Sequence, residues 1–348
     1  MRFQLSIRMN SQPEIVLSEP GRFERRTGDL PDPAPGEARI RIRRIGVCGT
    51  DIHAFHGRQP FFAYPRILGH ELGAEVIAVN GDSGWKPGEA VAVEPYLNDP
   101  ASPASQRGMT NCCESLRVLG VHVDGGMRPE LNVPIHKLHR GNAVPLDQLA
   151  LVEMLCIGRH AVNRGRVGKE DGVLVLGAGP IGLGVVAFLQ GKAGRLVVAD
   201  LSESRLAFCR ERMRVDETVV VRPDRDFGVD LRDAFGGGLP DLIFDATGNR
   251  GSMLSTFTLA AHGGRIVFVG LFQGEVVFDD PNFHRRELTV MSSRNATPSE
   301  FGQVIAAMES GAVDTSSWIT HRLAFDEVPE RFAPTIADPT LRKAVIEV

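Results

Sequence analysis

The sequence predicts a two-domain protein of the α/β plus β class, in which a β-rich domain accompanies a doubly wound parallel sheet. The chain has 348 residues, 43% of them hydrophobic and 24% charged, a globular composition at a length suited to two domains. Short runs of alternating apolar and polar residues fill roughly the first 150 residues, as in half-buried antiparallel strands. From about residue 172 to 278, apolar runs alternate with Gly turns and amphipathic segments, which favours buried parallel strands joined by helices.

Particular runs justify each zone in turn. Ala38–Ile45 and Glu75–Val79 are typical strands of the β-rich zone. The chain ends in a β-type run, Lys343–Val348, which we expect to return to the first domain. We therefore predict one domain at residues 1–150 and 291–348, and a second at residues 151–290. The buried parallel strands expected in the second domain are Val173–Leu176, Leu196–Ala199, Leu242–Phe244 and Arg265–Val269.

Composition argues against several classes of protein. A net charge of −4 lacks the basic excess of a nucleic-acid binder, so we expect no nucleic-acid partner. Five Cys form no even disulfide framework, which favours a reducing compartment. The first residues hold no apolar core typical of a signal peptide, and the longest apolar run, Val173–Leu189, is interrupted by Gly and Pro. We therefore expect a cytoplasmic protein without a membrane span.

A glycine-rich loop follows the first predicted parallel strand. Gly177, Gly179 and Gly182 form the G-x-G-x-x-G pattern of a dinucleotide-binding turn, completed by Pro180 and Ile181. The first Gly permits the tight turn, the second lets the backbone approach a pyrophosphate, and the third lets helix and strand pack closely. The N-terminus of the following helix attracts the anion. We therefore expect this loop to bind a dinucleotide.

The residue that ends the second parallel strand indicates which dinucleotide binds. Asp200 lies 18 residues after Gly182, where a carboxylate accepts hydrogen bonds from the ribose hydroxyls and repels a 2′-phosphate. This favours NAD over NADP. Arg205 leaves NADP open, because a nearby guanidinium accommodates that phosphate.

Candidate metal ligands occur in the first predicted domain and at the start of the second. Cys48 and His70 offer the sulfur and nitrogen donors that suit zinc, and Glu71 and Glu153 add carboxylate oxygens. Each residue by itself has an ordinary structural explanation. In a chain that also carries a dinucleotide loop, their combination favours a zinc site.

These motifs together resemble one family, the zinc-dependent medium-chain dehydrogenases, which include sorbitol, threonine and alcohol dehydrogenases. The resemblance extends from about Glu14 to Val348. It implies a GroES-like catalytic domain and a Rossmann domain. Its motifs are Cys-Gly-Thr-Asp at 48–51, Gly-His-Glu at 69–71, Glu153, the loop at 177–182 and Asp-Ala-Thr-Gly at 245–248.

The resemblance also implies roles for individual residues. Cys48 and His70 would bind one catalytic zinc, with Glu71 and Glu153 as neighbouring carboxylates that bind the metal directly or through water. Thr50 and His53 would form a proton relay. The remaining implied roles are orientation of the ligating His by Asp51, and cofactor binding by Thr247 and Gly270.

Further stretches resemble the sugar-acid branch of the family, which includes L-galactonate and L-gulonate 5-dehydrogenases. These are residues 52–66, 120–126 and 293–297. The branch oxidises a secondary hydroxyl of a hexonate to a keto acid with NAD. A carboxylate substrate favours a guanidinium partner, so we expect Arg294 or Arg66 to bind it, with a structural salt bridge or a cofactor-phosphate contact as the alternative for each. Asn295 and His122 are the candidates for binding substrate hydroxyls.

Alternative functions remain at this stage. A polyol or L-threonine is the alternative substrate within the family. A zinc-free quinone or enone reductase would lack Cys48 and His70, and a non-catalytic nucleotide-binding protein would have no need of Thr50 and His53.

A second zinc is expected to be absent. Many family members hold a structural zinc with the spacing Cys-x2-Cys-x2-Cys-x7-Cys. Here that spacing falls on Asp99, Ser102, Ser105 and Cys113, so three thiolates are missing. We therefore predict one zinc per chain, at Cys48, His70 and a carboxylate, and a zinc-free lobe held by packing or by contacts with another subunit.

The run Leu271–Phe278 is expected to be an edge strand that pairs in a homo-oligomer, a dimer or a tetramer.

Overall fold

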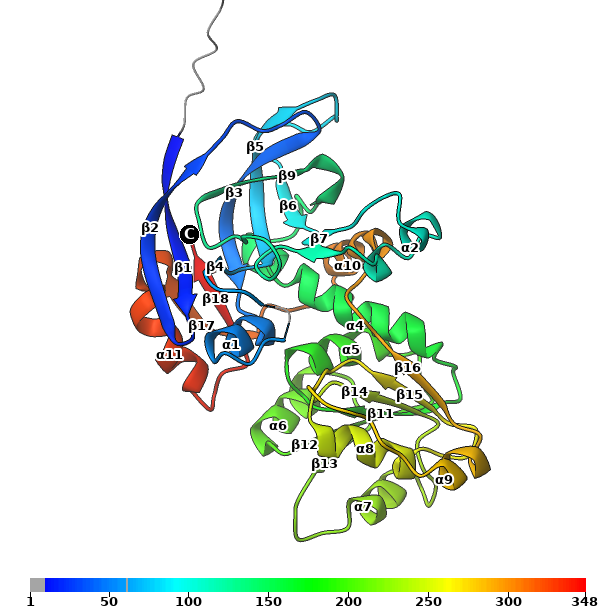
Figure 1. The fold of residues 1–348 in the computed structure, drawn as a ribbon. Coiled ribbons are helices and arrows are strands. Elements are labelled where there is room, and N and C mark those ends of the chain that lie inside the picture. Colours follow the sequence, from blue (N-terminus) through cyan, green and yellow to red (C-terminus); the bar gives the residue numbers. More distant parts are fainter. Residues whose placement is uncertain (1–9, 61) are drawn as a thin grey trace, which may run out of the picture. The chain divides into compact units, whose positions relative to one another are not determined.

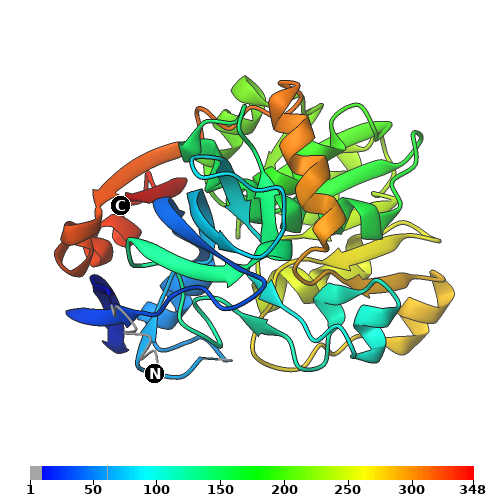
Figure 2. The same ribbon diagram turned by 90° about the horizontal axis from the view of Figure 1, so that it is seen from above.

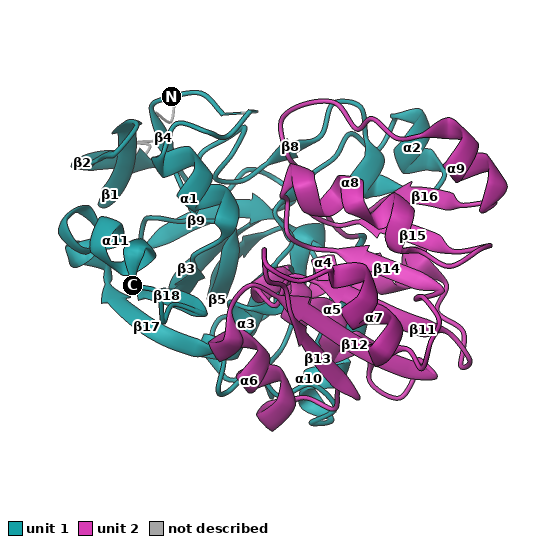
Figure 3. Ribbon diagram, turned by 90° about the horizontal axis from the view of Figure 1, so that it is seen from below, with its two compact units in different colours: residues 1–153, 297–348 teal, residues 154–296 magenta. Residues whose placement is uncertain are grey.

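The computed structural model describes residues 10–60 and 62–348 of the chain, which follow the course drawn in Figure 1. They divide into two compact units, the first ending at Glu153 and resuming at Thr297–Val348, the second spanning Met154–Ala296 (Figure 3). Both divisions fall a few residues after the predicted domain boundaries. Residues 1–9 of the predicted first domain lie outside the described residues.

The first unit is built on a largely antiparallel seven-stranded sheet. Its order is β10-β6-β5-β3-β18-β17, with β9 also paired to β3, and only β17 and β18 run parallel. Its strands are β3 (Glu37–Gly46), β5 (Glu71–Asn80), β6 (Ala90–Val93), β9 (Glu130–Pro134), β10 (Leu138–Arg140), β17 (Ile319–Ala324) and β18 (Lys343–Glu347).

Two smaller sheets complete the strands of the first unit. One has the order β2-β1-β4, and the other pairs β7 with β8. Their strands are β1 (Asn10–Glu19), β2 (Arg22–Leu30), β4 (Arg66–Ile67), β7 (Tyr96–Leu97) and β8 (Arg117–Val118). The unit's helices are α1 (Gly49–Phe55), α2 (Pro103–Gln106), α3 (Leu146–Leu149), α10 (Pro298–Glu309) and α11 (Val328–Ala337), with the first turn of α4 (Val152–Gly165).

The predicted return of the chain end to the first domain is confirmed. β18 pairs antiparallel with β3, placing Val345 opposite Gly46, and Figure 2 shows this C-terminal strand in red near the blue strand of the sheet. The expected strands within Ala38–Ile45 and Glu75–Val79 are parts of β3 and β5, which pair with each other.

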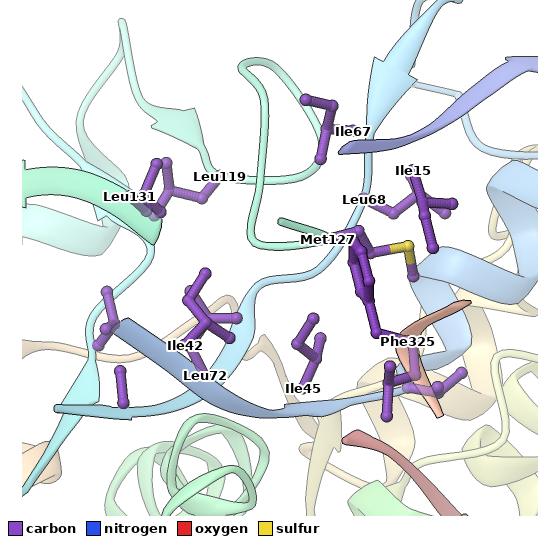
Figure 4. Packing of buried hydrophobic residues seen from close by; sticks show 14 of the residues in the cluster. Ile15, Ile42, Ile45, Ile67, Leu68, Leu72, Leu119, Met127, Leu131 and Phe325 are labelled. Carbon is purple, nitrogen blue, oxygen red and sulfur yellow. The ribbon is translucent and has the colours of Figure 1, made fainter. Parts of the chain in front are cut away.

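The core of the first unit collects apolar side chains from the sheets and from the C-terminal segment. Figure 4 shows Ile42 and Ile45 of β3 near Leu72 of β5, with Met127 and Phe325 in the same cluster. Most of these side chains are almost fully buried, and each such side chain contributes roughly 1.5–3 kcal/mol. This packing holds β3 and β5 in register, and those two strands lead to the candidate metal ligands.

The second unit contains the predicted doubly wound parallel sheet, of order β13-β12-β11-β14-β15-β16. All its pairings are parallel, and its interior strands are buried on both faces, as near-continuous apolar runs require. The strands are β11 (Gly172–Leu176), β12 (Arg195–Asp200), β13 (Glu217–Val220), β14 (Leu242–Asp245), β15 (Arg265–Phe268) and β16 (Thr289–Ser292). The helices are the rest of α4, α5 (Pro180–Leu189), α6 (Glu203–Arg212), α7 (Phe227–Ala234), α8 (Arg250–Leu259) and α9 (Asp280–Arg285).

The pairing predicted for Leu271–Phe278 is between two copies of the chain and stays a prediction. Leu271–Phe278 forms no strand, and β16 is the edge of the sheet instead. Gly274 has φ +142, a conformation outside the extended range, and it interrupts the run. Among the described residues, every helix is too short or too polar to span a lipid bilayer.

Candidate functional site

Three metal-ligating side chains gather where β3, α1 and β5 meet. Cys48 directly precedes α1, His70 directly precedes β5, and Glu71 begins that strand. One ligand atom from each lies within 4.8 Å of the others, so we call these three residues the donor cluster. Gly46 lies opposite Glu71 in the sheet, and a Cβ at position 46 would lie 2.0 Å from Glu71 Oε2. The missing side chain therefore leaves room for this carboxylate.

The Asp51 carboxylate contacts both Cys48 and His70. Its Oδ2 accepts a hydrogen bond from the backbone N–H of Cys48 at 2.8 Å, and its Oδ1 lies 3.7 Å from His70 Nδ1. Asp51 is the third residue of α1, so the start of this helix fixes the carboxylate beside the cluster. The arrangement suits the predicted role of orienting a ligating His.

Two carboxylates, Glu71 within the donor cluster and Glu153 beside it, are each held by a buried hydrogen-bond donor. Lys343 of β18 donates hydrogen bonds to Glu71 Oε2 and, at 2.9 Å, to the carbonyl of Val47. Glu153, in the first turn of α4, accepts a hydrogen bond from the hydroxyl of Tyr96 at its Oε1. Each carboxylate is therefore held at one oxygen by a buried donor.

The electrostatics of this region call for a cation. Asp51 Oδ1, His70 Nδ1 and Glu71 Oε1 are buried without a hydrogen-bond partner. Burial raises the pKa values of the Asp51 and Glu153 carboxyls, against the opposing attraction of His70. Burial alone lowers the pKa of His70, but the nearby Asp51 and Cys48 outweigh it and hold that pKa well above its ordinary value. A divalent cation would neutralise the same excess of negative charge.

The donor set fits zinc in particular. Sulfur, imidazole nitrogen and carboxylate oxygen together match zinc, and three protein donors are the number typical of a catalytic site, where a fourth position stays open. A hard cation such as Mg²⁺ would favour oxygen donors throughout. The residues present therefore fit the predicted zinc.

The two residues of the predicted proton relay lie on α1. Thr50 and His53 are three positions apart, so they share a face of this helix. His53 is largely exposed, and partial burial of its ring, then Arg58 and His56, lower its pKa. The imidazole is therefore neutral at pH 7 and able to accept a proton.

In the second unit, the glycine loop joins β11 to α5 as expected. Gly177 has φ +93, which favours glycine. A Cβ at position 182 would lie 1.7 Å from the carbonyl oxygen of Gly177, so only glycine fits there. Gly179 precedes α5 as its N-cap, followed by Pro180 and Ile181 in the first turn. The α5 N-terminus thus begins directly at the turn, in the arrangement that binds a pyrophosphate.

Asp200 ends β12 beside this loop. Its Oδ2 accepts a hydrogen bond from Ala178 N at 2.6 Å, and its Oδ1 accepts one from Ser202 N at 2.7 Å. Arg205 of α6 reaches the loop from the other side, since its Nη1 would lie 3.8 Å from a Cβ at Gly179. A carboxylate and a guanidinium therefore flank the glycine turn.

The other two predicted cofactor residues lie after neighbouring strands. Thr247 follows β14 and donates its hydroxyl to Asp245 Oδ1 at 2.6 Å. Asp245 is fully buried, and burial raises its pKa. Gly270 follows β15, where a Cβ would lie 2.3 Å from the backbone nitrogen of Gly248. Both positions thus lie at the carboxyl edge of the parallel sheet, where such folds bind ligands.

The predicted substrate residues lie in two places. Arg66 in the first unit forms an ion pair with Asp124 at 3.0 Å, while its Nε is buried without a partner. His122 accepts a hydrogen bond at Nδ1 from Val118 N at 3.1 Å. Arg294 and Asn295 lie in the second unit after β16, with Arg294 exposed and Asn295 at φ 52. The ion pair of Arg66 is the structural alternative expected for that residue.

The four positions with structural-zinc spacing form hydrogen bonds with one another. Asp99 N donates to Cys113 Sγ at 3.3 Å, and the hydroxyls of Ser102 and Ser105 lie 3.0 Å apart. Ser102 also caps α2 by accepting from Ser105 N. The hydrogen bond with Ser102, against the effect of burial, lowers the pKa of the Cys113 thiol to about 7.

A chain of hydrogen bonds ties this lobe to the sheet. Asn98 donates to Ser105 Oγ at 3.0 Å and accepts from Lys137 Nζ at 2.8 Å. Lys137 is 2% exposed and also pairs with the buried Glu94 at 2.5 Å. The lobe therefore has a polar anchor in addition to the packing that the sequence predicted.

The sequence reasoning missed Tyr96 and Lys343. Both contact candidate ligand carboxylates, and both are buried. One signal was present, since only five of the 39 basic residues are Lys and one of these begins the apolar run at 343–348. A Lys in such a run indicates a buried carboxylate partner.

Comparisons with known proteins agree with this architecture. Residues 34–144 match the family described as alcohol dehydrogenase GroES-like domain, and residues 180–310 match the family described as zinc-binding dehydrogenase. The chain is 41% identical over 326 residues to L-galactonate-5-dehydrogenase of Escherichia coli K12, covering 93% of this chain and 95% of that protein. It is 29% identical over 318 residues to 2-dehydro-3-deoxy-L-galactonate 5-dehydrogenase of Pseudoalteromonas atlantica, covering 90% and 92%.

A solved structure is similar over the same extent. It is the rspB alcohol dehydrogenase of Escherichia coli CFT073 in complex with NADH, which superposes with a TM-score of 0.89 at 29% identity, covering 97% of this chain and 99% of that one. The predicted family and fold class are thereby confirmed. The chain belongs to the zinc-type medium-chain alcohol dehydrogenases, which are oxidoreductases acting on CH–OH groups.

Proposed function

We propose that the chain is an NAD- and zinc-dependent dehydrogenase that oxidises a secondary hydroxyl of a hexonate, such as L-galactonate or L-gulonate, to a keto acid. The donor cluster of Cys48, His70 and Glu71 carries the proposal, because its partly buried sulfur and its buried nitrogen and oxygen donors fit a catalytic zinc. The similarity to L-galactonate-5-dehydrogenase supports the substrate class. Bound NAD⁺ would supply the acceptor for the hydride of the carbinol carbon, and the hydroxyl proton would leave for solvent.

The donor cluster would hold the metal, with Asp51 orienting His70. A bound zinc polarises a substrate oxygen and lowers the pKa of its hydroxyl. Lys343 compensates part of the negative charge of Glu71 and keeps that carboxylate at the cluster.

Proton removal is assigned to α1. Thr50 would accept the substrate's hydroxyl proton while passing its own proton onward towards His53, and His53, neutral at pH 7 because its pKa is lowered, would accept a proton and release one to water. The exposure of His53 favours this outer role, since the proton ends in solvent.

The glycine loop and its flanking charges would bind NAD. The amides at the start of α5 face the pyrophosphate, assisted by Arg205. Asp200 is fixed by two backbone N–H groups, and its remaining lone pairs accept the ribose hydroxyls while its charge repels a 2′-phosphate. Thr247 and Gly270 are proposed to contact the cofactor at the same sheet edge.

Arg294 or Arg66 is proposed to bind the substrate carboxylate, since both lie in stretches that resemble the sugar-acid branch. Arg66 also forms an ion pair with Asp124. Asn295 and His122 are proposed to bind substrate hydroxyls, and His122 is held by the hydrogen bond that its Nδ1 accepts from Val118 N.

A homo-oligomer is also proposed. Leu271, Val277 and Phe278 are 66%, 62% and 43% exposed, and β16 leaves one edge of the parallel sheet unpaired within the chain. Exposed apolar side chains and an open strand edge both favour association of two copies, as a dimer or within a tetramer. Sedimentation of the protein as a monomer at micromolar concentration would contradict this.

A cytoplasmic location is proposed from the thiols. The cysteines at 48, 112, 113, 156 and 209 are outside any disulfide, including the adjacent pair. Thiols outside disulfides suit a reducing compartment.

The decisive experiment follows NADH absorbance after the zinc-loaded protein is mixed with NAD⁺ and a substrate panel. The panel contains L-galactonate, L-gulonate, sorbitol, L-threonine and a simple alcohol. We expect the hexonates to give the highest kcat/KM, the Cys48→Ser variant to give none, and the matched thiol variant Cys112→Ser to behave as wild type. Preferred oxidation of sorbitol or L-threonine would overturn the substrate class, and absence of NADH with every substrate would overturn the reaction.

A further inference from the structure

Tyr96 is a buried hydroxyl donor aimed at the candidate zinc site. It lies on β7, is 1% exposed, and donates its hydrogen bond to Glu153 Oε1. Its ring packs edge-on against Phe301 of α10, with ring centroids 6.2 Å apart. The ring is thus fixed by packing, and the hydroxyl by its buried acceptor.

The Glu71 carboxylate of the donor cluster and the neighbouring Glu153 carboxylate have different kinds of hydrogen-bond donor. Glu71 is bound at Oε2 by Lys343, a cation, whereas Glu153 is bound at Oε1 by a neutral phenol. A cationic donor compensates the charge of its carboxylate, and a neutral donor orients the carboxylate while leaving its charge uncompensated. Tyr96 therefore fixes the orientation of the Glu153 carboxylate without supplying a compensating cation.

We propose that Tyr96 is a positioning residue of the zinc site, which acts by fixing the Glu153 carboxylate beside the donor cluster. This inference rests on the proposed function, because it requires zinc at Cys48, His70 and Glu71. Groups that orient carboxylates around a metal change its affinity by about 10–100-fold when removed.

The test removes the Tyr96 hydroxyl alone and measures metal retention. Tyr96→Phe keeps the ring and its contact with Phe301. Its zinc affinity, measured by competition with a chromogenic chelator, is expected to fall about tenfold or more. We expect kcat with the zinc-saturated variant to fall more than KM rises.

The second tyrosine of the chain supplies a matched control. Tyr64 also donates its hydroxyl to a partner within the first unit, the carbonyl of Ala54, and is absent from the proposed site. Tyr64→Phe is expected to retain zinc as wild type does. A loss of zinc shared equally by both variants would mean a general weakening of the fold and would overturn the proposal.

A double-mutant cycle identifies the path of the effect. If Tyr96 acts through Glu153, adding Tyr96→Phe to Glu153→Ala lowers zinc affinity no further. Additive losses, or unchanged or tighter zinc binding by Tyr96→Phe alone, would overturn the proposal. Failure of the proposed function is distinguishable, because wild-type protein would then bind no zinc or oxidise no hexonate.

Discussion

At the scale of single residues, backbone N–H groups hold a carboxylate of the proposed cofactor site in place. Asp200 is held at the end of β12 by the amides of Ala178 and Ser202, so its carboxylate needs no reorganisation to meet a ribose. His53, by contrast, is largely exposed on α1, where its lowered pKa keeps the ring neutral. Fixed carboxylates suit recognition, and an exposed imidazole suits proton exchange.

Replacing Asp200 by Ala should relax the choice of cofactor. Hydrogen bonds to a charged group contribute roughly 1.5–3 kcal/mol, so KM for NAD should rise at least about tenfold while use of NADP improves. Steady-state kinetics with both cofactors measure this. If the wild-type enzyme already prefers NADP, the assignment of Asp200 to the ribose is wrong.

Replacing His53 by Ala should lower kcat near neutral pH and steepen its dependence on pH. The folded pKa of His53 is below its ordinary value, so the wild-type ring accepts protons at pH 7 and loses this ability only as the pH falls. General-base steps contribute about 10²–10⁴-fold, and exchange with solvent bypasses part of that. Identical kcat profiles of variant and wild type from about pH 6 to 9 would remove His53 from the mechanism.

At the scale of elements, the turn between β11 and α5 brings the backbone of Gly177 very close to Gly182. The carbonyl of Gly177 points at the position that a side chain of residue 182 would occupy. In the first unit, the lobe at residues 98–113 shows another solution to local order. There hydroxyls and one thiol bond with one another, and Asn98 ties them to the buried Lys137.

Replacing Gly182 by Ala should disable the dinucleotide loop. The new Cβ would lie 1.7 Å from the carbonyl oxygen of Gly177, so the turn must open, and NADH affinity measured by fluorescence should fall more than about tenfold. Gly184→Ala in the same helix is the control, because its Cβ meets its nearest neighbour at an ordinary 3.6 Å. Equal NADH affinity in the two variants would show that the close contact is not needed.

At the scale of the whole molecule, the metal and dinucleotide sites belong to separate compact units. The donor cluster lies entirely in the first unit, and the glycine loop lies entirely in the second. Each unit has its own buried apolar cluster. Loss of one site should therefore leave the other folded.

Metal analysis of protein purified without added zinc should give close to one zinc per chain. The lobe at residues 98–113 retains only Cys113 at its four structural-zinc positions, and structural sites are nearly always four-coordinate. His70→Ala should lower the content towards zero while NADH still binds. Two equivalents of zinc in the wild type, or near-normal kcat in a zinc-free variant, would contradict this assignment.

The sequence by itself determined the features that are local in the chain. The parallel strands, the glycine turn, Asp200 at a strand end and the donors Cys48 and His70 follow from periodicity and short motifs, because each depends on neighbouring residues.

Only the tertiary structure decided the partners of the buried charges. Lys343 reaches Glu71 because β18 pairs with β3, and Tyr96 reaches Glu153 because β7 brings it to the start of α4. Leu271–Phe278 forms no strand within the chain, since a strand needs a neighbouring strand to supply its hydrogen bonds and the one predicted for this run belongs to a second copy. Buried polar atoms need partners wherever the fold places them, and residues far apart in the chain, here 57 and 272 positions, supply those partners without leaving a local signature.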